Sequence, residues 1–235
     1  MKKTYILLFC LIININLNGQ IKTQSLEVAN GEILNEIVET KIQYAFEEFV
    51  DNGSVIYKNG VISKGKLNYN YLLAEMQFIN PSTNEIFALA NVSDVSMIVI
   101  NNRRFLPLGK GGKFVELLSK GNISLAVNRD AKALSIGQTG VYGSVSPTSS
   151  ITAINHLSVD NSSHSLKVKN NICITVNNYY YLYTNGKLTF IKGIKTFSKI
   201  SSKSEVEVNK FVEDNKIDFK KEADLIKLTE YCNQL

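Results

Sequence analysis

Histidine, the side chain that most often carries out acid–base chemistry near neutral pH, occurs only twice in this chain. His156 and His164 flank Asp160 at four-residue spacing, which on a helix would place three possible metal ligands on one face. The serine and asparagine residues around them disfavour a helix, so two solvated loop histidines are the simpler interpretation. One of them could instead act as the general base of a hydrolase near neutral pH.

No other pattern identifies a catalytic residue, a metal ligand or a cofactor site. Serines are abundant, but no Gly-x-Ser-x-Gly motif presents one as a nucleophile, and no local motif pairs Cys173 with a histidine. The glycine-rich segment 108–114 lacks the spacing of a phosphate-binding loop. We interpret it as a bend between a strand that ends near Leu106 and one that begins near Phe114. No motif indicates the paired carboxylates that a glycosidase needs.

Aromatic residues gather in one place, where four tyrosines lie between positions 179 and 183. On a strand, Tyr179, Tyr181 and Tyr183 share a face. An exposed row of this kind could stack on sugars or on a peptide. The alternative is that tyrosines are good strand residues and that half of them cover the core. We therefore take Tyr179, Tyr181 and Tyr183 as candidate binding residues, with an envelope protein or glycan as the expected partner.

The first twenty residues predict export. Lys2 and Lys3 precede an apolar run over residues 5–15, and Gly19 supplies a small residue before Gln20, which is the pattern of a secretory signal peptide. The apolar run is shorter than the roughly 20 residues that span a bilayer as a helix. We therefore expect residues 1–19 to be removed and the chain to act in the periplasm or at the cell surface.

Bulk composition narrows the function classes. A mature chain that begins at Gln20 has 216 residues, enough for a domain with a hydrophobic core. Without Lys2 and Lys3 it carries 24 basic and 21 acidic residues, a surplus too small to predict nucleic-acid binding. It contains no further apolar run long enough to span a membrane. Cys173 and Cys232 could pair in an oxidising compartment, or Cys173 could be a small core residue and Cys232 a free thiol.

Short apolar runs bounded by turn residues predict a β-rich body over residues 20–192. Asn59-Gly60 and Asn185-Gly186 each lie between apolar runs, which is the strongest short-range signal of a β-hairpin; a type I′ turn needs positive φ at both residues. Apolar residues at 123, 125 and 127 alternate with smaller or polar ones, which predicts a half-buried strand. Residues 140–165 are rich in serine, which predicts a mobile segment that is either a long loop or a loosely paired hairpin.

The tail over residues 193–235 changes to a helical pattern. Ser202-Lys-Ser-Glu205 has the spacing of a capping box, and apolar residues then recur at helical spacing up to Asn215. A second helix is predicted over about residues 221–233. Helices this short are marginal alone, so they should dock on the sheet or on each other. The pattern over residues 21–49 is ambiguous, and residues 32–44 within it fit either a helix or a strand.

These patterns predict a mainly β (α+β) fold, in which an antiparallel β meander, roll or sandwich is followed by two short C-terminal helices. The expected organisation is a signal peptide (1–19), a β-rich body (20–192) with a serine-rich loop at about 140–165, and a helical tail (193–235).

Several short segments resemble a group of small exported proteins of Bacteroidota. The resemblance covers most of the mature chain but rests on structural motifs, so it transfers no functional residues. It implies an envelope location and a β-rich body with a helical tail. The segments that carry it are Gly53-Ser-Val-Ile-Tyr-Lys-Asn-Gly60, Leu67-Asn-Tyr-Asn-Tyr71, Glu75-Met-Gln-Phe-Ile79, Phe211, Asn215-Lys-Ile-Asp-Phe219, Glu222 and Asp224-Leu225.

The sequence thus predicts an exported, non-enzymatic envelope protein that acts as a binding or interaction module. The alternative is a hydrolase with an unrecognised site that uses a loop histidine.

The predicted signal peptide has a direct test. Intact-mass spectrometry of the exported protein should give a chain that begins at Gln20, because the small residue Gly19 completes the cleavage pattern. An exported protein whose N-terminus is still Met1 would contradict the prediction.

Overall fold

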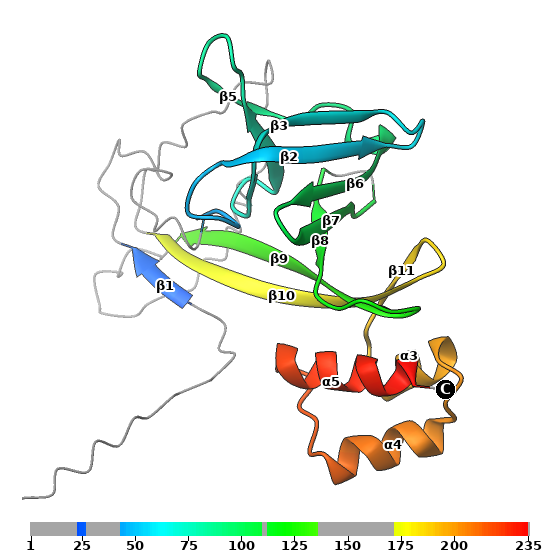
Figure 1. Ribbon diagram of the computed structural model, residues 1–235. Helices are drawn as coiled ribbons and strands as arrows, with labels where there is room; N and C mark the ends of the chain where they lie inside the picture. The colour runs from blue at the N-terminus through cyan, green and yellow to red at the C-terminus, as the bar shows by residue number, and fades with distance from the viewer. Residues whose placement is uncertain (1–22, 27–42, 110–111, 136–171, 235) are drawn as a thin grey trace, which may run out of the picture.

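A computed structural model of the chain describes residues 23–26, 43–109, 112–135 and 172–234 (Figure 1). The predicted signal peptide, the serine-rich loop and both histidines lie outside these residues.

The described residues form one antiparallel sheet followed by three helices, which confirms the predicted fold class. Strands pair in the order β1-β10-β9-β8-β7-β6-β2-β3-β4-β5, and β11 returns along β10. The strands are β1 (Thr23–Leu26), β2 (Val50–Tyr57), β3 (Ile62–Asn70), β4 (Glu75–Ile79), β5 (Ile86–Ala88), β6 (Val95–Ile100), β7 (Arg103–Pro107), β8 (Phe114–Leu117), β9 (Ser124–Ser135), β10 (Ile172–Thr184) and β11 (Lys187–Phe190); a 3-10 turn spans Val92–Asp94, and the helices are α3 (Ile194–Ile200), α4 (Glu205–Asp214) and α5 (Glu222–Asn233).

The sheet consists of two meanders joined where β2 pairs with β6. One meander runs from β2 to β5 and the other from β6 to β11. The sheet curls, so that β2 and β3 lie opposite β9 and β10 (Figure 1). A first core fills the space between them, with Tyr69, Phe105 and Phe114 among its largest fully buried side chains.

Both predicted hairpins are present, with different turns. Asn185 and Gly186 have φ angles of 49° and 75°, as a type I′ turn requires. In the turn of the β2–β3 hairpin, Gly60 has positive φ, at 85°, whereas Asn59 does not, and the N–H of Gly60 donates to the carbonyl of Tyr57. Lys58 adds a residue to this loop, so the turn is type I with the glycine in the left-handed region.

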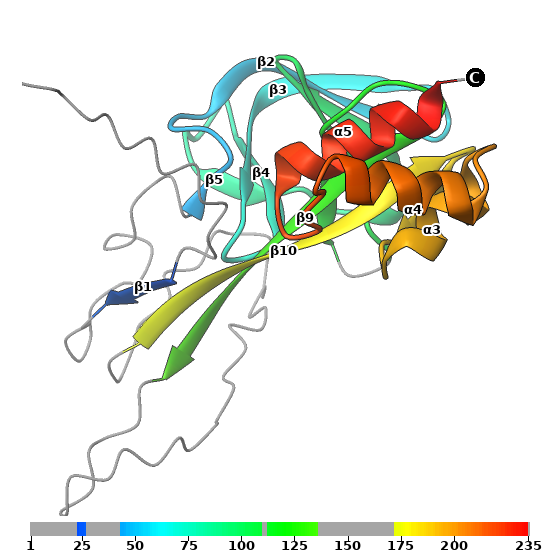
Figure 2. The same ribbon diagram turned by 90° about the horizontal axis from the view of Figure 1, so that it is seen from below.

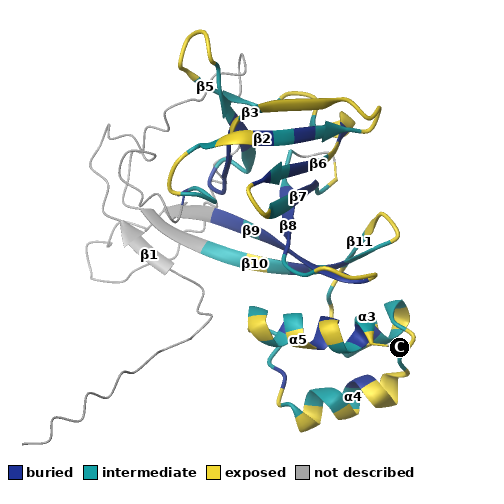
Figure 3. Cartoon of the chain, in the orientation of Figure 1, coloured by how far each residue is buried: buried dark blue, intermediate teal, exposed yellow. Residues whose placement is uncertain are grey.

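The prediction of a half-buried strand over residues 123–127 is wrong, because β9 is buried on both faces here (Figure 3). Leu125 and Val127 pack against the helices, whereas Ala126 packs with Leu106 and Val115 on the other side. The larger residues of this strand therefore face one core and the smaller ones face another, so neither face of the strand is exposed to solvent.

The helical tail packs on β9 and β10 (Figure 2). Its buried side chains meet those of the two strands in a second core, which we call the tail core. The tail core contains Ile123, Leu125, Val127, Tyr180, Leu182, Phe197, Val208, Ile217, Leu225, Leu228 and Cys232.

Helix α4 begins two residues later than predicted. Ser204, not Ser202, accepts a hydrogen bond from the N–H of Glu207, and the Glu207 carboxylate accepts one from the N–H of Ser204. Both serines have a glutamate three residues on, so the spacing alone cannot choose between them. Helix α5 matches its predicted range, whereas α3 was not predicted: it has seven residues and one buried side chain, Phe197.

Cys232 is a free, buried thiol within the tail core. Burial raises its pKa above the ordinary thiol value, while Ser201 and Lys203 act in the opposite direction. This matches the alternative in which Cys232 is a free thiol, although its burial in a core was not predicted.

The last turn of α5 is joined to β9 through one amide side chain. The N–H of Ile123 donates to Asn233 Oδ1 at 2.9 Å, and Asn233 Nδ2 donates to the Ile123 carbonyl at 2.7 Å. The Asn233 amide therefore makes the two hydrogen bonds to Ile123 that the backbone of a neighbouring strand would otherwise make. A Cβ at Gly121 would lie 2.7 Å from Asn233 Nδ2, so this close approach requires glycine.

Two valines of α4 test this packing. Val208 is fully buried in the tail core, and Val206 is 77% exposed. We expect Val208→Ala to lower the free energy of unfolding by about 1–2 kcal/mol, since it removes two buried methyl groups. Val206→Ala should change it by less than about 0.5 kcal/mol, and both substitutions have the same effect on helix propensity. Urea unfolding followed by circular dichroism measures both; equal values would contradict the placement of α4.

Candidate functional site

The three tyrosines chosen from the sequence are all half-buried. Tyr181 and Tyr183 pack against a small hydrophobic cluster on the face of β9 and β10 away from the helices. Tyr181 also meets Phe190 edge to face, with 5.4 Å between the ring centroids. Tyr179 differs from the other two, because it lines a cleft at the junction of the sheet and the helical tail.

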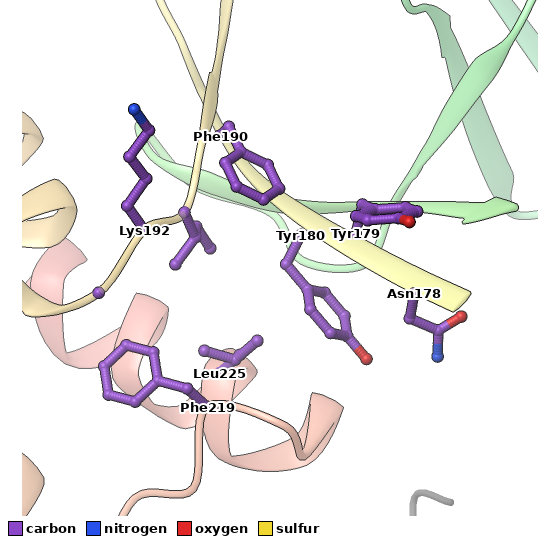
Figure 4. A pocket seen from close by; sticks show the side chains of 9 residues that line it. Asn178, Tyr179, Tyr180, Phe190, Lys192, Phe219 and Leu225 are labelled. Carbon is purple, nitrogen blue, oxygen red and sulfur yellow. The ribbon is translucent and has the colours of Figure 1, made fainter. Parts of the chain in front are cut away.

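This aromatic cleft has a volume of about 230 Å³ and lies between the β10–β11 hairpin and helix α5 (Figure 4). Its wall combines aromatic rings with a few polar groups, as binding sites for small ligands commonly do. The lining residues are Asn178, Tyr179, Tyr180, Phe190, Ile191, Lys192, Gly193, Phe219 and Leu225.

The β10–β11 hairpin brings one wall of the cleft together. Its register pairs Tyr181 with Phe190, and the N–H of Ile191 then donates to the carbonyl of Tyr180 at 2.9 Å. The chain turns away at Gly193, whose φ of 144° favours glycine. Lys192 is held there by its N–H, which donates to the hydroxyl of Thr196 at 3.1 Å.

Helix α5 forms the opposite wall, where Tyr180 descends from β10 toward Leu225 (Figure 4). Burial is the main cause that raises the pKa of Tyr180, and the charge of Glu222 raises it further. Asn178 and Arg129 favour the phenolate and act against this rise. The hydroxyl therefore stays protonated and lies between Asn178 and Glu222.

Glu222 is one end of a chain of charges that joins helix α5 to the sheet. Arg103 donates to both oxygens of Glu116 at 2.6 and 2.7 Å. Arg129 Nε lies 3.9 Å from Glu116, and its Nη2 lies 3.0 Å from Glu222. Burial lowers the pKa of Arg103, but the hydrogen bond and charge of Glu116 outweigh it and raise that pKa above its ordinary value.

The charge chain is suited to holding elements together rather than to acid–base catalysis. Glu116 accepts a bidentate hydrogen bond, and its side chain is 11% exposed, so no free carboxylate faces solvent there. Among the described residues, no group of three His, Cys, Asp or Glu side chains could hold a metal ion. In the same part of the chain, no helix is long and apolar enough to cross a membrane.

Comparison with known proteins adds no family: no family model, no curated protein and no solved structure matches this chain.

Sequence reasoning found Tyr179 but missed the rest of the cleft. A signal existed for Phe190, because a two-residue Asn185-Gly186 turn pairs the residues on either side and places position 190 opposite 181. No local pattern joins Phe219 and Leu225 to the hairpin, because their approach depends on how the tail docks.

Two carboxylates test the role of the charge chain. We expect Glu116→Gln to lower the free energy of unfolding by about 2 kcal/mol, because it leaves the partly buried Arg103 without its counter-charge. Asp51→Asn is the control: Asp51 is 77% exposed and 4.0 Å from Lys66, so its loss should cost less than about 0.5 kcal/mol. Urea unfolding measures both, and a Glu116 variant as stable as the control would show that the chain is dispensable.

Proposed function

We propose that this chain is an exported, non-enzymatic binding module of the cell envelope, and that its ligand is an envelope glycan held in the aromatic cleft. The observation that carries the proposal is the composition of the cleft, whose lining includes the aromatic residues Tyr179, Tyr180 and Phe190 and the polar residues Asn178 and Lys192.

Sugars match this composition. A pyranose ring presents C–H groups that stack on an aromatic face and hydroxyls that hydrogen-bond to amides and ammonium groups. Phe190 is 43% exposed and available for stacking, and Asn178 and Lys192, which also line the cleft, are exposed. Leu225 is fully buried beneath, which gives the cleft an apolar floor.

The exposed surface favours a glycan over a folded protein as the ligand. A typical protein interface buries about 800 Å² per partner around a core of large apolar side chains. In the part of the chain that the structure describes, the large exposed hydrophobic residues are Val61, Ile62, Phe190 and Val206. They lie on the β2–β3 hairpin, on β11 and on α4, so only Phe190 adjoins the cleft.

Binding to envelope glycans tests the proposal. The full chain should be retained by protease-treated envelope polysaccharide, and Phe190→Ala should weaken that retention at least tenfold, because it removes the exposed stacking ring. Tyr183→Ala is the matched control: it lies on β10, the strand that pairs with β11, but outside the cleft, and should change retention less than twofold.

Circular dichroism establishes that each variant is folded. Retention of wild type and Phe190→Ala to the same extent would contradict the cleft as the site. Capture of the chain by envelope proteins alone, with none by polysaccharide, would overturn the glycan as ligand.

A further inference from the structure

A second concave surface adjoins the aromatic cleft. This groove has a volume of about 630 Å³ and lies between the end of β11 and helices α3 and α4. It shares Phe190, Lys192 and Gly193 with the cleft, so the two form one continuous surface. We call it the lysine groove; its lining residues are Thr189, Phe190, Lys192, Gly193, Ile194, Lys195, Thr196, Lys199, Ile200, Glu205 and Asn209.

Positive charge is concentrated in the lysine groove. Lys192, Lys195 and Lys199 are all exposed, and Lys195 and Lys199 are one helical turn apart on α3. Like charges at this spacing repel each other. Within the described ranges, none of the three makes an ion pair, and Glu205 is the one carboxylate in the lining. The groove therefore carries an uncompensated positive charge that an anionic ligand would neutralise.

The lysines of the groove are positioned by the packing of α3 on the tail core, not by contacts of their own side chains. Phe197 of α3 is fully buried in the tail core, between Lys195 and Lys199 in sequence. It meets the ring of Phe219, a residue of the aromatic cleft, with 6.1 Å between centroids. One anchor thus holds the charged face of α3 at a defined place beside the cleft.

We propose that the glycan is acidic: a sugar ring stacks in the aromatic cleft while the carboxylates of neighbouring sugars lie against Lys192, Lys195 and Lys199. This inference rests on the proposed function and specifies its ligand class. A linear acidic polysaccharide suits a cleft that adjoins a charged groove, because each of its sugars carries both a ring that can stack and a carboxylate. The shared residues Phe190 and Lys192 stand where the stacking surface gives way to the charged one.

The probe is an oligogalacturonate, a chain of sugars with one carboxylate each, and its methyl ester is the neutral counterpart with the same backbone. Isothermal titration calorimetry of the full chain at about 0.15 M salt should show the acid form binding at least tenfold more tightly than the ester. At higher salt the difference should shrink, because salt screens exposed charges.

Two triple variants separate the groove from general charge attraction. Lys192→Gln, Lys195→Gln and Lys199→Gln together should weaken binding of the acid form at least tenfold. The control replaces Lys58, Lys64 and Lys120 with glutamine. These lysines are exposed and lie outside both linings, so the control should change binding of the acid form less than twofold. Both variants lose the same net charge. Equal losses in the two, or no loss in the first, would overturn the proposal.

Further outcomes distinguish this inference from the proposed function. If acid and ester bind equally and Phe190→Ala weakens both, the acidic ligand is wrong while the glycan-binding site stands. If neither the oligosaccharides nor envelope polysaccharide binds, both the acidic ligand and the proposed function are wrong. Binding to phosphatidylglycerol vesicles that depends on the three groove lysines, with none to the oligogalacturonate, would replace the glycan by a lipid headgroup and overturn the inference.

Discussion

The fold depends on a line of alternating charges that joins elements from distant parts of the chain. Arg103 on β7, Glu116 on β8, Arg129 on β9 and Glu222 on α5 follow one another in space. Arg103 also donates to the carbonyl of Ala45, before β2. Each charge is partly removed from water, so each requires its neighbours. Sheet curvature and helix docking are therefore coupled: an arrangement that displaced α5 would leave Arg129 short of a counter-charge.

This coupling explains why the candidate site lies where it does. The hydroxyl of Tyr180 is held beside Glu222, so the side chain that divides the cleft from the tail core is set by the same charges that position the helix. Phe219, on the connection before α5, packs on Phe197 of α3 and faces the cleft. Aromatic residues from β10, β11 and the tail thus meet at one place, although Tyr179 is the one member of this set that was a candidate from the sequence.

Features that depend on neighbouring residues could be predicted from the sequence. The Asn-Gly turns predict both hairpins, and apolar periodicity predicts α5, because backbone sterics and helix geometry act over a few residues. Burial could not be predicted in the same way. Alternation at residues 123–127 identifies a strand but cannot reveal that helices cover its second face. Likewise the shared face of Tyr179, Tyr181 and Tyr183 is correct, yet the cluster behind two of them comes from β7 and β8. The histidine and serine-loop predictions lie outside the described residues.

The amide of Asn233 has a consequence for the order in which this chain can fold. It completes the hydrogen bonding of Ile123, a residue 110 positions earlier. The tail core also draws its side chains from both ends of this interval. Contacts this distant in sequence form late and slowly. The tail core is therefore complete only once α5 has docked on β9.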